Sequence, residues 1–249
     1  MTPAAAWKLI SHPGLVRMYL NGPRSLTPVE AALALIASAK REEVERLRVE
    51  LIENHGFFDE FARAFVPVRH ERPAWPVWTE FVYLLVRLAR PAVFCETGVF
   101  DGKSSAIILQ ALEDNGSGML VSVDLPARAT IENSTERMIS STLPPARDPG
   151  WAIPERLRHR QRLLLGDASE LLPEFFAEFP AVDVFMHDSL HTYEHMSFEY
   201  SLAWQHLRAG GFLLSDDIFV ASAFHDFCRA RDLTYVAVGG FGATRREKS

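Results

Sequence analysis

The feature that most constrains the fold is an alternation of short apolar segments with amphipathic segments, which begins near residue 76. Strand-length apolar runs occupy Ala92–Glu96, Met119–Val123, Arg162–Leu165, Val182–His187, Gly211–Ser215 and Thr234–Val238. Helical spacing of apolar residues covers Lys103–Glu113, Ile131–Ser140, Ser169–Glu178, Tyr193–Arg208 and Ala221–Arg231. This alternation is typical of a mostly parallel sheet with helices on both faces. We therefore predict a doubly wound α/β fold.

The last predicted strand departs from the parallel pattern. The stretch Val238–Thr244 contains Gly239-Gly240, which favours a tight turn. Too few residues remain there for a crossover helix, so the strand after the turn is expected to be antiparallel. The weakly patterned stretch 126–154 is predicted to be a long loop, which would be either a functional lid or a disordered segment. The lid is favoured because the stretch follows a strand end where ligands bind in α/β sheets.

Residues 1–75 have a helical pattern. Thr27 is placed to cap a helix that starts at Pro28, with Glu30 completing a capping box. Apolar residues keep helical spacing through Leu51, and His55-Gly56 is a plausible stop. A short helix is expected over Phe58–Phe65, a linker at Pro67, Pro73 and Pro76, and a helix over Trp78–Leu88. The prediction is a helical extension over 1–75, acting as a cap or in oligomerisation, and a sheet domain over 76–249.

Composition excludes several classes of protein. The net charge of -6 argues against a nucleic-acid binder, which usually carries a basic face. Two cysteines, Cys95 and Cys228, support neither a disulfide framework nor a zinc cluster, so a cytoplasmic location is expected. No apolar stretch is long enough to span a bilayer, and the N-terminus lacks the pattern of a signal peptide.

A glycine-containing turn follows the first predicted strand. Gly98 and Gly102 allow a sharp turn and close approach of a ligand, and Ser104 lies in the first turn of the next helix. The spacing lacks the three glycines of a dinucleotide fingerprint, which counts against an NAD-linked oxidoreductase.

Three carboxylates end successive predicted strands near this turn. Asp124 could accept the two hydroxyls of a ribose, Asp167 could contact a base, and Glu96 could meet an ammonium group. S-adenosylmethionine carries all three groups. The alternative is that Asp124 and Asp167 are ordinary loop or helix-cap residues.

Acidic residues and a histidine follow the next two strands. Asp188, Asp216 and Asp217 should converge at the edge that carries the glycine turn, and the mutual repulsion of three carboxylates favours a cation. An all-oxygen set suits Mg²⁺ or Mn²⁺. His191, three residues after Asp188, could act as a general base, whereas His187 and His195 are expected to be structural. Alternatively, Asp216 or Asp217 caps the following helix.

Together these motifs resemble the class I S-adenosylmethionine-dependent methyltransferases, and within them the metal-dependent sugar and macrolide O-methyltransferases of the macrocin O-methyltransferase-like group. The resemblance covers about residues 78–246. It rests on the stretches Glu96–Ser104, Val123-Asp124, Gly166–Ala168, His187–Glu194 and Gly210–Asp217. It implies a seven-stranded Rossmann-like sheet, a cofactor site, a magnesium site and a catalytic base. The cofactor site would comprise Glu96, Thr97, Gly98, Gly102, Ser104, Asp124 and Asp167. Asp188, Asp216 and Asp217 would bind the metal, and His191 would be the base. Asp216 is a glutamate in some relatives.

The sequence thus predicts a magnesium-dependent O-methyltransferase acting on a hydroxyl of a small molecule, such as a sugar, glycoside, diol or catechol. Neither a nucleic acid nor a membrane is expected as a partner, and the N-terminal helices suggest a homo-oligomer. Two alternatives stay open: a non-catalytic S-adenosylmethionine-binding scaffold, and a methyltransferase that needs no metal.

Overall fold

A computed structural model gives the arrangement of residues 23–126 and 142–247. The helices are α3 (Pro28–Leu35), α4 (Arg41–Ile52), α5 (His55–Arg69), α6 (Val77–Ala89), α7 (Lys103–Asn115), the 3-10 helix η2 (Glu155–Arg160), α8 (Ala168–Glu178), α9 (Tyr193–His206) and α10 (Ala223–Ala230). The strands are β1 (Val93–Thr97), β2 (Met119–Asp124), β3 (Gln161–Leu165), β4 (Val182–His187), β5 (Leu207–Ser215), β6 (Tyr235–Val238) and β7 (Phe241–Arg245). The predicted helix Ile131–Ser140 lies outside the described residues.

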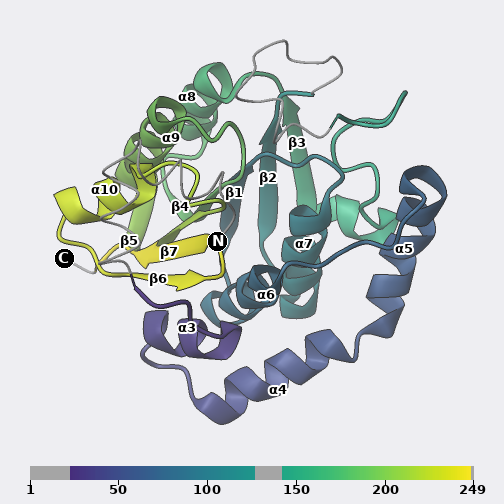
Figure 1. Ribbon diagram of the computed structural model, residues 1–249, viewed down its shortest axis with the longest axis horizontal. Helices are drawn as coiled ribbons and strands as arrows, with labels where there is room; N and C mark the ends of the chain where they lie inside the picture. The colour runs from purple at the N-terminus through teal and green to yellow at the C-terminus, as the bar shows by residue number, and fades with distance from the viewer. Residues whose placement is uncertain (1–22, 127–141, 248–249) are drawn as a thin grey trace, which may run out of the picture.

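The strands form one seven-stranded sheet in the order β3-β2-β1-β4-β5-β7-β6 (Figure 1). Strands β1 to β5 pair in parallel, whereas β7 pairs antiparallel with both β5 and β6. The doubly wound fold and its antiparallel last strand are therefore confirmed. Successive strands are added on one side of β1 up to β3 and on the other side from β4 on, so the strand order reverses between β1 and β4. Ligands in such folds bind at the strand ends beside that point.

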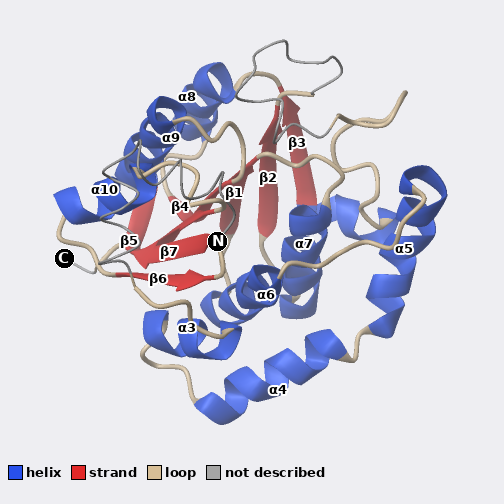
Figure 2. Ribbon diagram, viewed as in Figure 1, coloured by secondary structure: helices blue, strands red, loops and turns tan. Residues whose placement is uncertain are grey.

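Helices cover both faces of the sheet (Figure 2). Side chains alternate along each strand, so Phe94 of β1 packs with α6 and α7 while its neighbour Cys95 packs with α8 and α9. Both residues are fully buried, as expected for a central parallel strand. In the part of the chain that is described, no helix is both long and apolar enough to cross a membrane.

The N-terminal helices belong to the same hydrophobic core as the sheet. Helices α3, α4 and α5 bury apolar side chains against α6 and α7. The backbone before α3 continues the sheet edge, because the amide of Leu26 donates to the carbonyl of Ala237 in β6 at 2.7 Å. The division near residue 75 and the role of the extension stay predictions.

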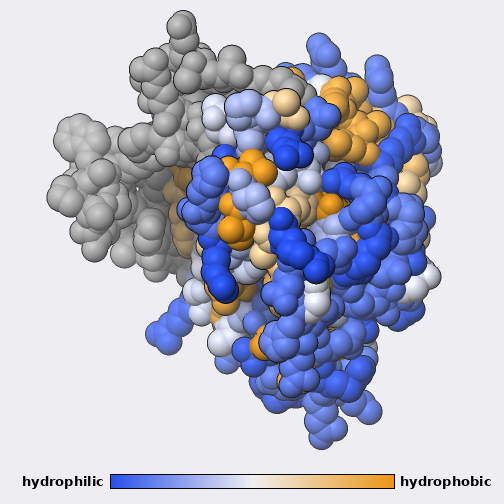
Figure 3. Space-filling model, turned by 90° about the vertical axis from the view of Figure 1, so that its right-hand side faces the viewer, coloured by the Kyte–Doolittle hydropathy of each residue, from blue (hydrophilic) through white to orange (hydrophobic). Residues whose placement is uncertain are grey.

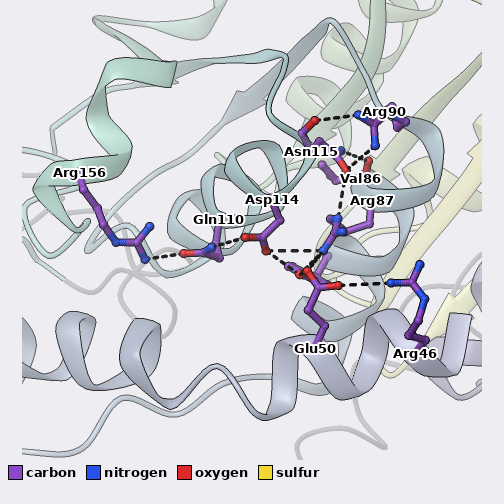
Figure 4. Close-up of polar contacts among 10 residues, drawn as sticks. Arg46, Glu50, Val86, Arg87, Arg90, Gln110, Asp114, Asn115 and Arg156 are labelled. Carbon is purple, nitrogen blue, oxygen red and sulfur yellow. Dashed lines mark hydrogen bonds and ion pairs between the residues drawn. The ribbon is translucent and has the colours of Figure 1, made fainter. Parts of the chain in front are cut away.

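A chain of polar contacts joins α4, α6, α7 and η2 (Figure 4). Arg87 of α6 forms an ion pair with Glu50 of α4, and Tyr83 donates to Asp114 of α7 at 2.6 Å. Gln110 donates to Asp114 at 2.7 Å and accepts from Arg156 of η2 at 2.6 Å. The network therefore runs from the N-terminal extension across α6 and α7 to the segment before β3.

The outer side of α5 faces solvent. That side of the molecule is mostly hydrophilic, with several small hydrophobic groups between the polar ones (Figure 3). Val66 of α5 is among the exposed apolar residues. The inner side of the helix buries Phe57, Phe61 and Phe65, so α5 is amphipathic.

Several predicted boundaries were wrong. The capping box at Thr27 is present, but its helix ends at Leu35 and α4 is a separate helix. His55-Gly56 begins α5, with Asn54 as its N-cap, and Pro67 lies inside α5 instead of in a linker. The buried phenylalanines stabilise α5 enough to tolerate a proline in its last turns.

The end of α9 also differs from the prediction. The helix ends at His206, and β5 begins at Leu207 instead of Gly211. The pairing of β4 with β5 shifts register between Val182 and Val184, so the extra residues of β5 form an irregularity. A bulge of this kind has no periodic signal in the sequence.

Candidate active site

The predicted site residues come together at the carboxyl-terminal edge of the sheet. Backbone hydrogen bonds continue the parallel ladder beyond the strand ends, from Gly166 N to Asp124 O (3.0 Å), Gly98 N to Val123 O (2.8 Å), Asp188 N to Thr97 O (2.8 Å) and Asp216 N to His187 O (2.9 Å). The ends of β1 to β5 are thus fixed relative to one another. The glycine turn, the carboxylates at the strand ends and the loop that contains His191 therefore lie along one edge of the sheet.

The glycine turn lies directly against the loop after β4. Gly98 has φ +84°, and a Cβ added there would lie 1.8 Å from the carbonyl oxygen of Asp188. Gly102 has φ +90° and precedes α7, in whose first turn Ser104 is buried. Only glycine fits at position 98, because a side chain would need both a disfavoured backbone conformation and space that Asp188 occupies.

Asp124 is held against this turn. Its Oδ2 accepts hydrogen bonds from the amides of Val99 at 2.6 Å and Phe100 at 3.0 Å. Burial raises the pKa of Asp124, and the two amide bonds oppose that rise. The carboxylate therefore has a fixed orientation, while its contact with a ribose stays a prediction.

Glu96 is a fully buried carboxylate with one unsatisfied oxygen. Its Oε1 accepts from the hydroxyls of Ser105 at 2.5 Å and Ser122 at 2.7 Å, whereas Oε2 has no hydrogen-bond partner among the described residues. Burial raises the pKa of Glu96 to about 7. A cationic group near Oε2 would satisfy this oxygen and favour the ionised carboxylate.

Two other predicted cofactor residues have structural partners. Asp167 is the N-cap of α8 and accepts from the amide and hydroxyl of Ser169 at 2.7 and 2.6 Å. Thr97 donates its hydroxyl to Glu199 at 2.6 Å inside the protein. The capping alternative thus describes Asp167, and its contact with a base stays a prediction.

Asp188, His191 and Asp216 form a compact group. One ligand atom from each lies within 4.8 Å of the others. Burial and then the charge of Asp216 raise the pKa of Asp188, while burial and then Asp217 raise the pKa of Asp216 to about 6. Two buried carboxylates whose charged forms are disfavoured, with an imidazole beside them, match the donors that Mg²⁺ or Mn²⁺ takes. These residues fit a divalent cation.

Asp217 lies beside this group but is not part of it. The residue has φ +50°, and its Oδ1 points towards Gly240, 3.8 Å from where a Cβ on that glycine would lie. Neither Asp216 nor Asp217 caps α10, whose N-cap is Ser222. Binding of a metal by Asp217 stays a prediction.

His191 has a buried ring nitrogen that can accept a hydrogen bond or bind a cation. Its Nε2 has no hydrogen-bond partner within the described chain, and burial together with the neighbouring His187 lowers the pKa of His191 to about 4. The imidazole is therefore neutral near pH 7 and can accept a proton or bind a cation.

One buried residue, Glu199 of α9, was not predicted from the sequence. It accepts from Thr97, from Ser189 at 2.8 Å, and from two histidine rings, His187 Nδ1 at 2.7 Å and His195 Nε2 at 2.9 Å. Burial alone would raise the pKa of Glu199, but these partners lower it. His187 and His195 thus have structural partners, in agreement with the prediction. The i, i+4 spacing of His195 and Glu199 was the available signal.

Comparisons with known proteins show a family match over part of the chain and solved structures with the same fold. Residues 95–218 match the model of a family described as "Methyltransferase domain". One similar structure is the O-methyltransferase TomG from Streptomyces achromogenes, which is involved in tomaymycin synthesis and was solved with S-adenosylmethionine. Its sequence is 20% identical to this one and the TM-score is 0.53, over an alignment that covers 77% of this chain and 89% of TomG. An O-methyltransferase from Bacillus cereus in complex with S-adenosylhomocysteine is 14% identical with a TM-score of 0.56, and the alignment covers 81% of this chain and 96% of that one. A methyltransferase from Geobacter sulfurreducens is 19% identical with a TM-score of 0.53, and the alignment covers 79% of this chain and 90% of that one. These structures show the fold, and a comparison with curated proteins gives no match.

Proposed function

We propose that the chain is a class I S-adenosylmethionine-dependent methyltransferase and that it methylates a hydroxyl group of a small molecule with the help of a divalent cation. The observation that carries this proposal is the group formed by Asp188, His191 and Asp216, whose ligand atoms lie within 4.8 Å of one another. It lies at the sheet edge that also carries the glycine turn. Similarity to O-methyltransferase structures supports a hydroxyl as the acceptor.

The cofactor half of the site would bind through the groups around the turn. Glu96 would pair its unsatisfied oxygen with the ammonium group of the cofactor, Asp124 would accept the ribose hydroxyls, and Asp167 would lie near the base. Thr97, Gly98, Gly102 and Ser104 would shape the backbone around the methionine part.

The acceptor half of the site would position a hydroxyl and remove its proton. Asp188 and Asp216, with Asp217 beside them, would hold Mg²⁺ or Mn²⁺, which when bound supplies positive charge that favours loss of the acceptor proton. His191, neutral near pH 7, would accept that proton at Nε2. Leu190 and Tyr193, which lie close to His191 in the sequence and have exposed side chains, would offer apolar contact to a ring-shaped acceptor. A sugar, glycoside, diol or catechol has both the ring and the hydroxyls.

Two further parts of the proposal concern the setting of the enzyme. Cys95 and Cys228 are free and buried, which fits a reducing cytoplasm. Exposed Val49 and Ile52 on α4 would contribute to a homo-oligomer. The expected partners are small molecules, with neither a nucleic acid nor a membrane among them.

The experiment that tests the proposal is methyl transfer from isotopically labelled S-adenosylmethionine to a panel of sugars, glycosides and catechols. We expect the labelled methyl group to appear in the product of at least one hydroxyl acceptor, loss of that product on addition of EDTA, and its return on addition of Mg²⁺ or Mn²⁺. Product formation that is unchanged in EDTA would favour a methyltransferase that needs no metal. Cofactor binding without turnover on any acceptor would favour the scaffold.

A further inference from the structure

A partly buried ion pair connects the N-terminal extension to the glycine turn. Asp101 lies between Phe100 and Gly102, and only 3% of its side chain is exposed. Arg69, the last residue of α5, donates to both of its carboxylate oxygens, from Nε at 2.8 Å and Nη2 at 2.6 Å. Trp151 donates its indole N–H to the same carboxylate at 2.7 Å. Asp101 is thus fully satisfied by residues outside the turn.

The residue before Asp101 has a strained backbone. Phe100 has φ +50°, which is uncommon for a residue with an aromatic side chain. Its amide donates to Asp124 at 3.0 Å, its carbonyl accepts from Gly150 at 2.8 Å, and the Arg69 guanidinium lies 4.8 Å from the centre of its ring. A conformation of this kind persists only when surrounding contacts impose it.

These contacts bear directly on Asp124. The amides of Val99 and Phe100 that hold the Asp124 carboxylate belong to the segment that Arg69 and Trp151 fix from the other side. Movement of Phe100 out of its strained conformation would withdraw one of those amides. The orientation of Asp124 therefore depends on a residue of α5.

The attachment of α5 to the protein does not depend on this ion pair. Its phenylalanines pack against Trp75, with ring centroids 5.8 Å (Phe57) and 5.0 Å (Phe61) from that indole. Glu60 of α5 also pairs with Arg156 of η2 at 2.8 Å. Arg69 is therefore available for a role other than holding the helix in place.

We propose that Arg69 is a positioning residue for the cofactor: by pairing with Asp101 it holds the turn 98–102 in the conformation that binds S-adenosylmethionine. The N-terminal extension is thereby part of the cofactor site, although it would make no contact with the cofactor through Arg69. This inference rests on the binding of S-adenosylmethionine at the glycine turn, as in the proposed function.

The test is calorimetric titration of Arg69→Lys, Asp101→Asn and the double variant with S-adenosylhomocysteine. Lysine keeps the charge but cannot donate two parallel hydrogen bonds, so we expect about a tenfold weaker affinity. Because the two residues act as one pair, the double variant should lose no more affinity than either single variant. Arg156→Lys is the matched control: it alters the other ion pair of α5, away from the turn, and should keep the wild-type affinity.

Thermal unfolding of the ligand-free variants separates positioning from stability. Arg69→Lys and Arg156→Lys should unfold at similar temperatures while only the former binds S-adenosylhomocysteine more weakly. Wild-type affinity in both Arg69→Lys and Asp101→Asn would overturn the inference and leave the proposed function intact. An equal loss of affinity in Arg156→Lys would also overturn it, because the effect would then come from α5 in general. Absence of binding by the wild-type protein would instead count against the proposed function.

Discussion

Replacing Asp188 by asparagine is expected to lower the rate of methyl transfer by roughly 10²–10³-fold. Asparagine has the shape of aspartate but lacks its charge, so the variant removes one anionic donor from the group that it forms with His191 and Asp216. The affinity for S-adenosylhomocysteine should stay within about twofold of wild type, a change below the energy of one net hydrogen bond. Turnover with saturating acceptor and calorimetric titration with S-adenosylhomocysteine measure these two expectations. Mn²⁺ binding followed by electron paramagnetic resonance checks that the variant has lost a metal ligand.

The same variant should not be less stable than wild type in the absence of metal. Burial and the charge of Asp216 raise the pKa of Asp188, so its ionised form destabilises the folded state near neutral pH. A neutral side chain removes that cost, and the unfolding temperature should be unchanged or higher. Loss of activity would then not be an effect of unfolding.

Asp183→Asn is the matched control for this variant. It makes the same substitution near the start of β4, the strand that Asp188 follows, but Asp183 accepts from the amides of Ala92 and Val93 at 2.8 and 2.9 Å, near the start of β1. Turnover of Asp183→Asn should stay near that of wild type. If Asp188→Asn also turned over like wild type, Asp188 would have no role in binding a catalytic metal.

Replacing Gly98 by alanine is expected to destabilise the protein by about 2–5 kcal/mol and to abolish measurable binding of S-adenosylhomocysteine. The position has φ +84°, and the added Cβ would lie 1.8 Å from the carbonyl oxygen of Asp188. Because that atom belongs to the backbone, the turn and the loop after β4 must move apart. Urea denaturation and calorimetric titration measure the two effects.

Gly116→Ala separates the backbone conformation from the steric clash. Gly116 ends α7 with φ +67°, and no atom lies within 4 Å of a Cβ added there. Its replacement should cost only the conformational penalty of about 1–2 kcal/mol and leave cofactor affinity unchanged. Equal destabilisation by the two substitutions would mean that the close approach of the turn to Asp188 does not matter.

Local patterns predicted most of the sheet. Strand β4 has the predicted bounds Val182–His187, and the capping box at Thr27 is present, because both depend on neighbouring residues. The convergence of Asp188 and Asp216 could be predicted because parallel strands end at one edge, a consequence of topology alone. Features that depend on the surroundings of a single residue were harder to predict. Pro67 lies inside α5 because packing stabilises that helix, and Asp167 acts as the N-cap of α8.

Contacts between residues distant in sequence could not be predicted. Arg69 and Asp101, like Glu199 and Thr97, meet only because the helices pack on particular faces of the sheet. Each of these residues, taken alone, is an ordinary polar residue in its own segment. The positive φ of Asp217, +50°, is likewise a backbone feature that its position in the sequence does not reveal.

The most direct test of the central claim is calorimetric titration of cofactor-free protein with S-adenosylhomocysteine, the expected product. We predict binding in the micromolar range, about −8 kcal/mol, and at least tenfold weaker binding by Asp124→Ala. This variant removes the carboxylate that the amides of Val99 and Phe100 hold at the end of β2. Binding by wild type that Asp124→Ala does not weaken would place the cofactor elsewhere. No binding by protein confirmed to be free of cofactor would contradict the assignment of this sheet edge as a methyltransferase site.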